Sequence, residues 1–460
     1  MRLIERNPEL VRNAWLELSP ERLLITPLLL IAVCALHWLA QAPQLAAVTT
    51  RFGFPFALLA VIGWGARRSG ESLREEQLAG TWDAQRMSGL SAWQLASGKL
   101  FGGASFSWYL AAWCIALTLP ARLAQLGLPI VALQVCVIIG LGLVAQACGL
   151  LAALGGNLGP SRKRSFGVLI TGLLVLSLAW FPLGITAHDL GGSWWSAPLH
   201  WWGAELPRTG FVLASLLVAV ALALLGIERR MREELQQPGL PWPWLLALAA
   251  LYVYTGGFVW SQQLPALTLR WHGLQPPAWM LAMVDRPFVV ASSWAMLTMT
   301  LCYLSFFYEA RDPILWRRGL HAAVRGDWRR ALSQTPLWLL SLLVAAVLTV
   351  TAALLSASVP LALRGTAMLV FVVRDLTLML AVSLSGTRSR AAAAPFSLLL
   401  VVYVLIPVLL WLAGLHALVP LLNPQLISGS ASMLLCSALL QAVAAAVWLR
   451  LRWRAVFTLR

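Results

Sequence analysis

The chain has 460 residues, of which 60% are hydrophobic and only 11% are charged. Soluble globular domains have about half apolar and about a quarter charged residues, so this composition excludes that class and predicts an all-α polytopic membrane protein. The net charge of +16 does not indicate nucleic-acid binding, because the arginines lie in short loops between apolar runs, where they orient helices and meet anionic lipid.

Residues 1–22 predict an amphipathic elbow helix that lies on the inner leaflet. Asn7-Pro8 and Ser19-Pro20 are each a capping residue followed by proline at the first helical position. Five apolar residues share one helical face, and four polar residues share the other: Leu10, Val11, Ala14, Trp15 and Leu18 against Glu9, Arg12, Asn13 and Glu17. The following apolar run, 23–40, is long for a signal-peptide core and lacks a convincing cleavage site, so we expect a retained transmembrane helix.

The apolar runs long enough to cross a bilayer predict about twelve spans. They lie at about 23–40, 52–66, 99–120, 128–154, 166–187, 209–227, 242–262, 286–308, 336–357, 366–384, 396–418 and 427–449. A division near residue 237 gives two halves of six spans each, 23–237 and 238–460. The second half carries a basic cytoplasmic segment at 309–335.

Residues 71–99 are the one long polar interruption in the first half of the chain. We expect a first helix that ends at Gly80, and a short second helix capped by Thr81. After a break at Gly89, the capping-box spacing of Ser91 to Gln94 opens the next apolar helix. Such a helix-turn-helix offers a partner protein a firm contact; the alternative is a loop whose charges only keep it in water.

The residues that carry a family resemblance are Glu76, Gly80-Thr81, Asp83, the turn Ser88-Gly89-Leu90-Ser91, and Gly98-Lys99. The pattern resembles the cytoplasmic signature of ABC-2 type transporter permeases, E-x-x-x-G-T-x-[ED] followed by a Thr-Pro-Leu-Ser-like turn and Gly-Lys. Here Ser-Gly-Leu-Ser replaces the preferred turn, and Ala84-Gln85 replaces the usual Leu or Glu-Leu. The resemblance implies a coupling helix seated on a separate ATPase subunit, present in two copies, with these contact residues: Glu76, Gly80, Thr81, Trp82, Asp83, Arg86 and Lys99.

The distribution of arginine predicts the orientation of the chain. Clusters of basic residues fall on one side of the predicted spans, at 67–68, 162–164, 228–230, 311–330, 388–390 and 450–460. Both termini should therefore lie in the cytoplasm, and the resemblance implies the inner membrane of a bacterium. On the other side, the loop 188–207 contains four tryptophans, which fit either an interfacial anchor belt or a re-entrant segment.

An internal repeat fits the chain in two registers. In the preferred one, which accounts for every span, 71–99 corresponds to 308–336 and 155–165 to 385–395. In the other, the start of the elbow helix at 7–12 corresponds to 312–317. In either register the second half lacks the E-x-x-x-G-T pattern, so we expect the two halves to differ.

Neither catalytic nor cofactor motifs are evident in the sequence. The P-loop pattern G-x-x-x-x-G-K-[ST] is absent, so we expect ATP and Mg²⁺ on the partner ATPase and not on this chain. The six histidines are too scattered for a metal site. The six cysteines all fall in apolar runs without a C-x-x-C spacing, which is typical of small hydrophobic residues.

Polar residues inside the predicted spans are the remaining candidates. Arg374 and Asp375 lie near the middle of the span 366–384, where ionisable groups are costly and face a bundle interior or an aqueous cavity. Adjacent helix positions point about 100° apart, so we expect each to have a partner elsewhere. The pair forms either an interhelical contact or a lining of the translocation path. Gln134 and Gln146 are predicted to pack helices through hydrogen bonds.

The sequence predicts the permease subunit of an ATP-driven ABC-2 type transporter, and the resemblance implies an exporter. Two alternatives stay open. A secondary, ion-coupled transporter also has twelve spans in two halves, but it leaves the Gly-Thr-Trp-Asp segment unexplained. A membrane scaffold subunit that does not transport would need only the helices. Membrane lipid is an expected partner in each case, and nucleic acid is not.

Overall fold

The computed structural model describes residues 7–40, 53–154, 198–237, 239–261, 286–308, 313–356, 358–385, 393–415, 418–422 and 430–458. These residues are helical except for short turns and one small sheet. Nine of their helices are long and apolar enough to cross a membrane, or ten if the bent pair α2 and α3 counts as one span. The chain is therefore a multi-pass helical membrane protein.

The predicted number of spans is confirmed only in part. The predicted span 166–187 lies outside the described residues. The predicted span 52–66 continues without a break into a polar helix, so residues 53–79 form one helical run that is not among the nine. The structure thus supports nine or ten of the twelve.

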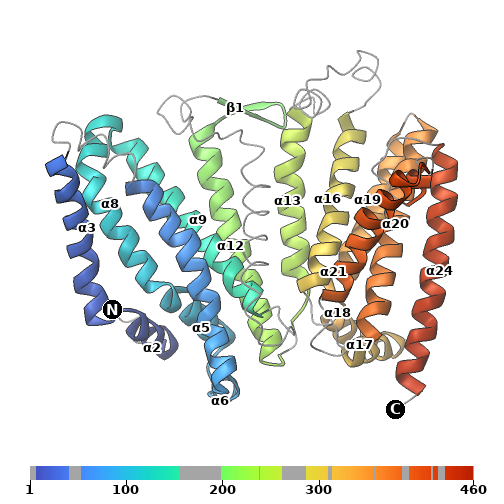
Figure 1. Ribbon diagram of the computed structural model, residues 1–460, viewed down its shortest axis with the longest axis horizontal. Helices are drawn as coiled ribbons and strands as arrows, with labels where there is room; N and C mark the ends of the chain where they lie inside the picture. Colours follow the sequence, from blue (N-terminus) through green and yellow to red (C-terminus); the bar gives the residue numbers. More distant parts are fainter. Residues whose placement is uncertain are drawn as a thin grey trace. The chain divides into compact units, whose positions relative to one another are not determined.

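The described residues form two compact units. The first comprises those up to 154, with 198–199 and 205–247. Its helices, shown in blue to green in Figure 1, are α2 (Pro8–Glu17), α3 (Pro20–Ala40), η2 (Ala60–Gly65), α5 (Ala66–Ala79), α6 (Trp82–Arg86), α7 (Ala92–Ser97), η3 (Gly98–Gly102), α8 (Ser105–Leu126), α9 (Leu128–Leu154) and α12 (Arg208–Glu234). A two-stranded sheet of β1 (Pro198–Trp201) and β2 (Ala204–Pro207) precedes α12.

The second unit comprises residues 200–204 and the described residues from 248 onward. It takes most of α13 (Trp242–Ser261), followed by α16 (Arg286–Tyr308), α17 (Pro313–Val324), α18 (Trp328–Gln334), α19 (Leu337–Leu355), α20 (Val359–Ser385), α21 (Ala393–Leu400), η5 (Val401–Leu405), α22 (Ile406–Leu412), α23 (Val419–Leu422) and α24 (Ala431–Thr458). Its core packs α16, α19 and α20 around Phe306, Ala345 and Met379.

Helix α2 turns its polar face to the protein. Glu9, Asn13 and Glu17 are buried, whereas Trp15 and Leu16 are 84% and 70% exposed. This arrangement is the reverse of a surface helix in a soluble protein and is the one expected for a helix whose apolar side lies in lipid. The predicted amphipathic helix is therefore present, with Asn7 as its N-cap; its position on the inner leaflet stays a prediction.

Two glycines allow α5 and α9 to cross at close range. A Cβ atom on Gly149 would lie 2.1 Å from the carbonyl oxygen of Ala66, and one on Gly70 would lie 2.8 Å from the carbonyl oxygen of Gly149. Helices in membranes pack most closely through such small residues. Nearby, Gln146 donates to the Val61 carbonyl at 3.2 Å and accepts from Trp108 at 3.1 Å, which confirms its predicted packing role.

The described part of the tryptophan-rich loop is the β1–β2 hairpin. Trp201 ends β1 and Trp202 lies in the turn. Their indole nitrogens donate to the carbonyl oxygens of Tyr254 and Val253 at 3.1 and 3.0 Å. The ring of Trp202 also packs on Trp260. These two tryptophans therefore hold the hairpin to α13; the other two in the loop lie outside the described residues.

Candidate functional site

The turns of the segment 71–99 form largely as its sequence predicts. Helix α5 ends at Gly80, which has a φ of +71°, a left-handed conformation that favours glycine. Gly89 is also left-handed, at φ +73°. Ser91 and Gln94 form the predicted capping box. Thr81 occupies the N-cap position of α6, as predicted, but without the side-chain bond of a cap. Its hydroxyl donates instead to the Glu76 carbonyl at 3.4 Å.

A buried ionic cluster joins α2, α5 and η3. The Lys99 ammonium is fully buried; it donates to the Glu9 carboxylate at 3.0 Å and also contacts Glu76. Arg12 reaches both carboxylates, Glu9 at 3.2 Å and Glu76. Asn13 donates a further hydrogen bond to Glu9 at 2.8 Å. Two cations thus neutralise two anions, which is the condition under which charges can be buried at low cost.

Lys99 keeps its charge within this cluster. It precedes the membrane-spanning part of α8, which begins at Ser105. Burial lowers the pKa of Lys99 to about 8, while the Glu9 carboxylate acts in the opposite direction. The lysine is therefore protonated at neutral pH, as its contacts with two carboxylates require.

A second set of ion pairs links α2 to α5. Glu17 contacts Arg68, whose guanidinium also donates to Glu71 and Glu75 at 3.1 Å. Arg22 contacts Glu17 from the other side, at 3.3 Å. Together the two sets of ion pairs hold α2, α5 and η3 to one another.

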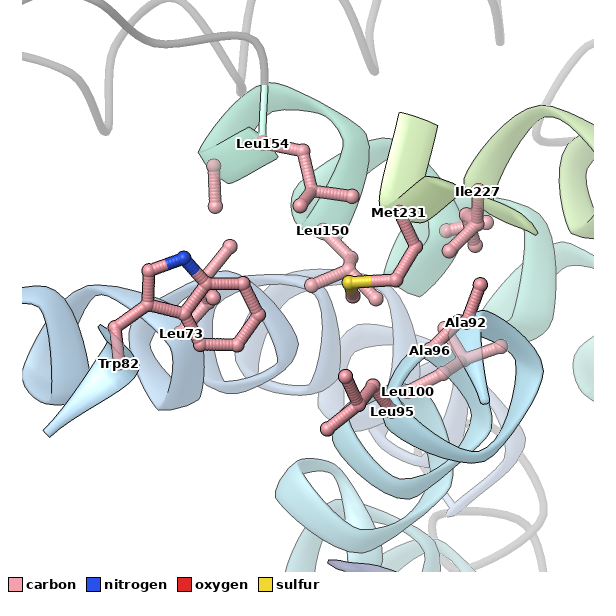
Figure 2. Close-up of a cluster of buried hydrophobic side chains, with 12 residues drawn as sticks. Leu73, Trp82, Ala92, Leu95, Ala96, Leu100, Leu150, Leu154, Ile227 and Met231 are labelled. Carbon is pink, nitrogen blue, oxygen red and sulfur yellow. The ribbon is translucent and has the colours of Figure 1, made fainter. Parts of the chain in front are cut away.

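Trp82 lies in the interior and not on the surface. It is 6% exposed and belongs to an apolar cluster of α5, α6, α7, η3, α9 and α12 side chains. Figure 2 shows its indole ring close to Leu73, with Leu150 and Met231 in the same cluster. The Lys99 ammonium also lies 5.3 Å from the centre of the ring. The resemblance implies that Trp82 contacts the ATPase, and we had expected its ring to be exposed for that contact; this expectation is wrong, because α6 turns the ring toward α9 and α12.

The exposed surface of the segment 71–99 is formed by other side chains on and beside α6. Leu78 and Met87 are 68% and 82% exposed. The Asp83 side chain is 81% exposed and pairs with Arg86 at 3.4 Å. Helix α6 itself lies at the lower end of the first unit as drawn in Figure 1. The candidate contact surface is thus Leu78, Asp83, Arg86 and Met87, which we call the α6 tip.

The seven predicted coupling residues divide by position. Glu76, Trp82 and Lys99 support the segment from within, and Gly80 and Thr81 form its turn. Asp83 faces outward, and Arg86 is half-buried beside it. Sequence reasoning missed Glu9 and Glu17 as members of the site. Their signal was present, since two acidic residues on the side of α2 opposite its apolar face need cations in the protein.

The second candidate site is the buried pair Arg374 and Asp375 in the second unit. Both side chains are at most 2% exposed. Arg374 donates to its neighbour Asp375 at 2.8 Å, and the hydroxyls of Tyr303 and Tyr403 donate to the other carboxylate oxygen at 2.7 and 2.5 Å. Arg374 also contacts Gln441 of α24. We expected Arg374 and Asp375 to have partners on other helices and not to pair with each other. They do pair, because the long arginine side chain folds back on Asp375. The expected partners on other helices are also present.

A cavity of about 310 Å³ opens beside this pair, between α16, α20 and the α21–η5 helix. Its walls are mostly apolar and include three methionines, Met296, Met299 and Met368. The two tyrosines that hold Asp375 also line it. The volume is at the lower end of the range of small-molecule sites.

In the described part of the chain, no group of three or more His, Cys, Asp or Glu side chains is arranged so that it could hold a metal ion. Comparison with known proteins adds no relative: no protein-family model, no curated protein and no solved structure matches the chain.

Proposed function

We propose that this chain is the transmembrane permease subunit of an ATP-driven transporter, coupled through residues 71–99 to a separate ATPase. The observation that carries the proposal is the mounting of the α6 tip. Leu78, Asp83 and Met87 of the tip are exposed. The helices on either side of the tip are fixed by the Glu9–Glu76–Lys99 cluster and by the apolar cluster around Trp82. A segment that transmits movement from a partner protein needs exposed residues for the contact and a rigid attachment to the helices behind it.

The path of such a push follows from the contacts. Helix α5 is continuous with the helical run that begins at residue 53, and α7 and η3 lead into α8. Displacement of the α6 tip would therefore move two long helices together, while α7 would carry it to α12, which it contacts. Rigid-body movement of packed helices is a common way to transmit a conformational change.

The resemblance to ABC-2 type permeases supplies the remainder of the proposal. It implies an exporter in a bacterial inner membrane, two copies of the ATPase that hold ATP and Mg²⁺, and cytoplasmic termini. The basic residues Arg229, Arg230 and Arg232 at the end of α12 agree with a cytoplasmic location for that end of the first unit.

The contacts of the buried pair Arg374 and Asp375 argue against the alternative of a secondary, ion-coupled transporter. A carboxylate has about four acceptor positions. Asp375 accepts one hydrogen bond from Arg374 and one from each tyrosine, and the second guanidinium nitrogen of Arg374 lies 2.7 Å from the same carboxylate. A carboxylate that binds a proton or cation in each transport cycle needs an oxygen free for it. The geometry therefore favours a structural role for this pair over ion coupling.

The test uses charge changes at the α6 tip. Asp83→Arg and Met87→Glu should leave the protein inserted and abundant but lower co-purification with the ATPase at least tenfold, the loss expected for a contact at the centre of an interface. Glu21→Arg makes the same charge change as Asp83→Arg at an exposed position in the first turn of α3 and should have no effect. Normal binding and normal transport-linked hydrolysis in both tip variants would contradict the proposal.

A further inference from the structure

The helical hairpin α17–α18 exposes large apolar side chains. Among its described side chains, at 317–334, Leu320 and Val324 are 62% and 87% exposed, and Trp328 and Leu332 are 66% and 43% exposed. Positions 320 and 324 are four residues apart, as are 328 and 332, so each pair forms one stripe on its helix. A hairpin in water would not keep such stripes open.

The side of the hairpin that faces inward is made of small residues. Ala322 and Ala331, each 7% exposed, are the described side chains of this hairpin that are buried. The two helices contact each other, and Gly319 approaches Gln334 so closely that a Cβ atom there would lie 3.3 Å from the Gln334 Cβ. The hairpin thus turns small residues inward and large apolar residues outward.

The same hairpin is strongly basic. Five exposed arginines and one histidine accompany the apolar stripes: Arg317, Arg318, Arg325, Arg329, Arg330 and His321. Asp327 is the one acidic residue of the sequence 313–334. Its carboxylate is used locally, since it accepts the backbone N–H of Arg330 at 3.1 Å.

The hairpin lies where the membrane surface is expected. It connects the end of α16 to the start of α19, two helices long and apolar enough to span the bilayer, at the lower end of the second unit as drawn in Figure 1. Helix α2 of the first unit also turns a large apolar side chain, Trp15, outward, but it buries the polar residues Glu9 and Asn13 where the hairpin buries alanines.

We propose that α17–α18 is a binding site for anionic phospholipid, in which the apolar stripes enter the headgroup region and the arginines contact lipid phosphates. Apolar and basic residues on one short helix are the features of interfacial membrane helices, and each arginine near an anionic surface strengthens binding on the order of fivefold. The proposal does not depend on the function proposed above, because any multi-pass protein could use such a site.

A protein partner fits the hairpin less well. The α6 tip is held by buried ion pairs and an apolar cluster, whereas the described side chains of α17–α18 are anchored inward by two alanines. The exposed side chains of α17–α18 include five arginines, and Asp327 is the one acidic residue of the sequence 313–334; this excess of positive charge suits lipid phosphates. We therefore assign lipid to α17–α18 and the ATPase to the α6 tip.

The experiment places an environment-sensitive fluorophore in the apolar stripe of α17, at its most exposed residue, Val324. Val324→Cys, in a chain whose six native cysteines are replaced, is labelled and reconstituted into bilayers of dioleoylphosphatidylcholine, with or without phosphatidylglycerol. Phosphatidylglycerol should shift the emission to the blue and make it quenchable by lipids brominated in their acyl chains, and high salt should weaken both effects. A label at Asp83, on the exposed α6 tip, serves as the aqueous control.

Neutral arginine variants test the charge. Arg325→Gln, Arg329→Gln and Arg330→Gln should each lower the ratio of inserted to uninserted label on the order of fivefold. Since labelling requires many changes, phosphatidylglycerol retained by the same arginine variants with native cysteines is measured by mass spectrometry as a second readout, and it should fall in parallel. Equal quenching with and without phosphatidylglycerol, equal lipid retention by all variants, or protection of the label only when an ATPase is added would each overturn the proposal.

Discussion

Lys99→Met should strongly destabilise the first unit. The ammonium is fully buried between Glu9 and Glu76, whose side chains are 4% and 11% exposed. Its removal leaves two buried carboxylates with Arg12 as their one remaining cation in the cluster, and that side chain is 44% exposed. Removal of one member of a buried ion pair costs about 3–5 kcal/mol, so we expect a loss of this size.

The assay is equilibrium unfolding in mixed micelles with increasing denaturing detergent. Arg67→Ala provides the control, because the Arg67–Glu71 pair is largely open, with the arginine side chain 68% exposed; its loss should be below about 1 kcal/mol. A Lys99→Met variant that loses no more than this control would refute the reasoning about the cluster.

A double-variant cycle separates the interaction from other effects of the substitution. Glu76→Gln alone should also destabilise, but Lys99→Met with Glu76→Gln should cost less than the sum of the two, by about 0.5–3 kcal/mol, because the second change removes the unpaired charge that the first creates. Strictly additive losses would show that the two side chains do not interact.

Three further predictions follow from the same structure. Trp82→Ala should reduce stability by about 3–5 kcal/mol, since it opens a hole in a closed apolar cluster; unchanged thermal stability in detergent would contradict the burial of the ring. Asp375→Asn should destabilise the second unit by about 3–5 kcal/mol, because the buried Arg374 loses its anion; the exposed Glu21→Gln is the control, and equal midpoints for the two variants would argue against the network. A reporter fused after Arg232 should show a cytoplasmic location and one fused at Gly203 an external one; the same signal from both would exclude α12 as a span.

The sequence predicted the turns of the segment 71–99 better than its contacts. Gly80, Gly89 and the Ser91–Gln94 capping box are local features, fixed by backbone conformation and by side chains three residues apart. The direction of Trp82 is not local. Helix α6 has five residues, too few for an amphipathic pattern, and the cluster that receives the ring includes Ile227 and Met231, far along the chain.

The charged residues show the same limit. The cost of burying Arg374 and Asp375 was evident from their place in an apolar run, and their burial is confirmed. Their tyrosine partners could not be identified, because they lie 72 and 28 residues from Asp375 on other helices. The Gly98-Lys99 motif predicted that Lys99 contacts the ATPase. In the structure Lys99 instead forms a buried ion pair with Glu9 of α2, which is 90 residues away in the sequence.

The most direct test of the proposed function is a photo-crosslink from the α6 tip in intact membranes. A photoreactive phenylalanine at Met87 or at Asp83 should capture one partner, and the adduct should bind a photoreactive ATP analogue and hydrolyse ATP when purified. The same probe at Trp15, on the outward apolar face of α2, should capture lipid and no ATPase. Absence of a nucleotide-binding protein from the adducts at both tip positions, or the same adduct at Trp15, would contradict a coupling role for residues 71–99.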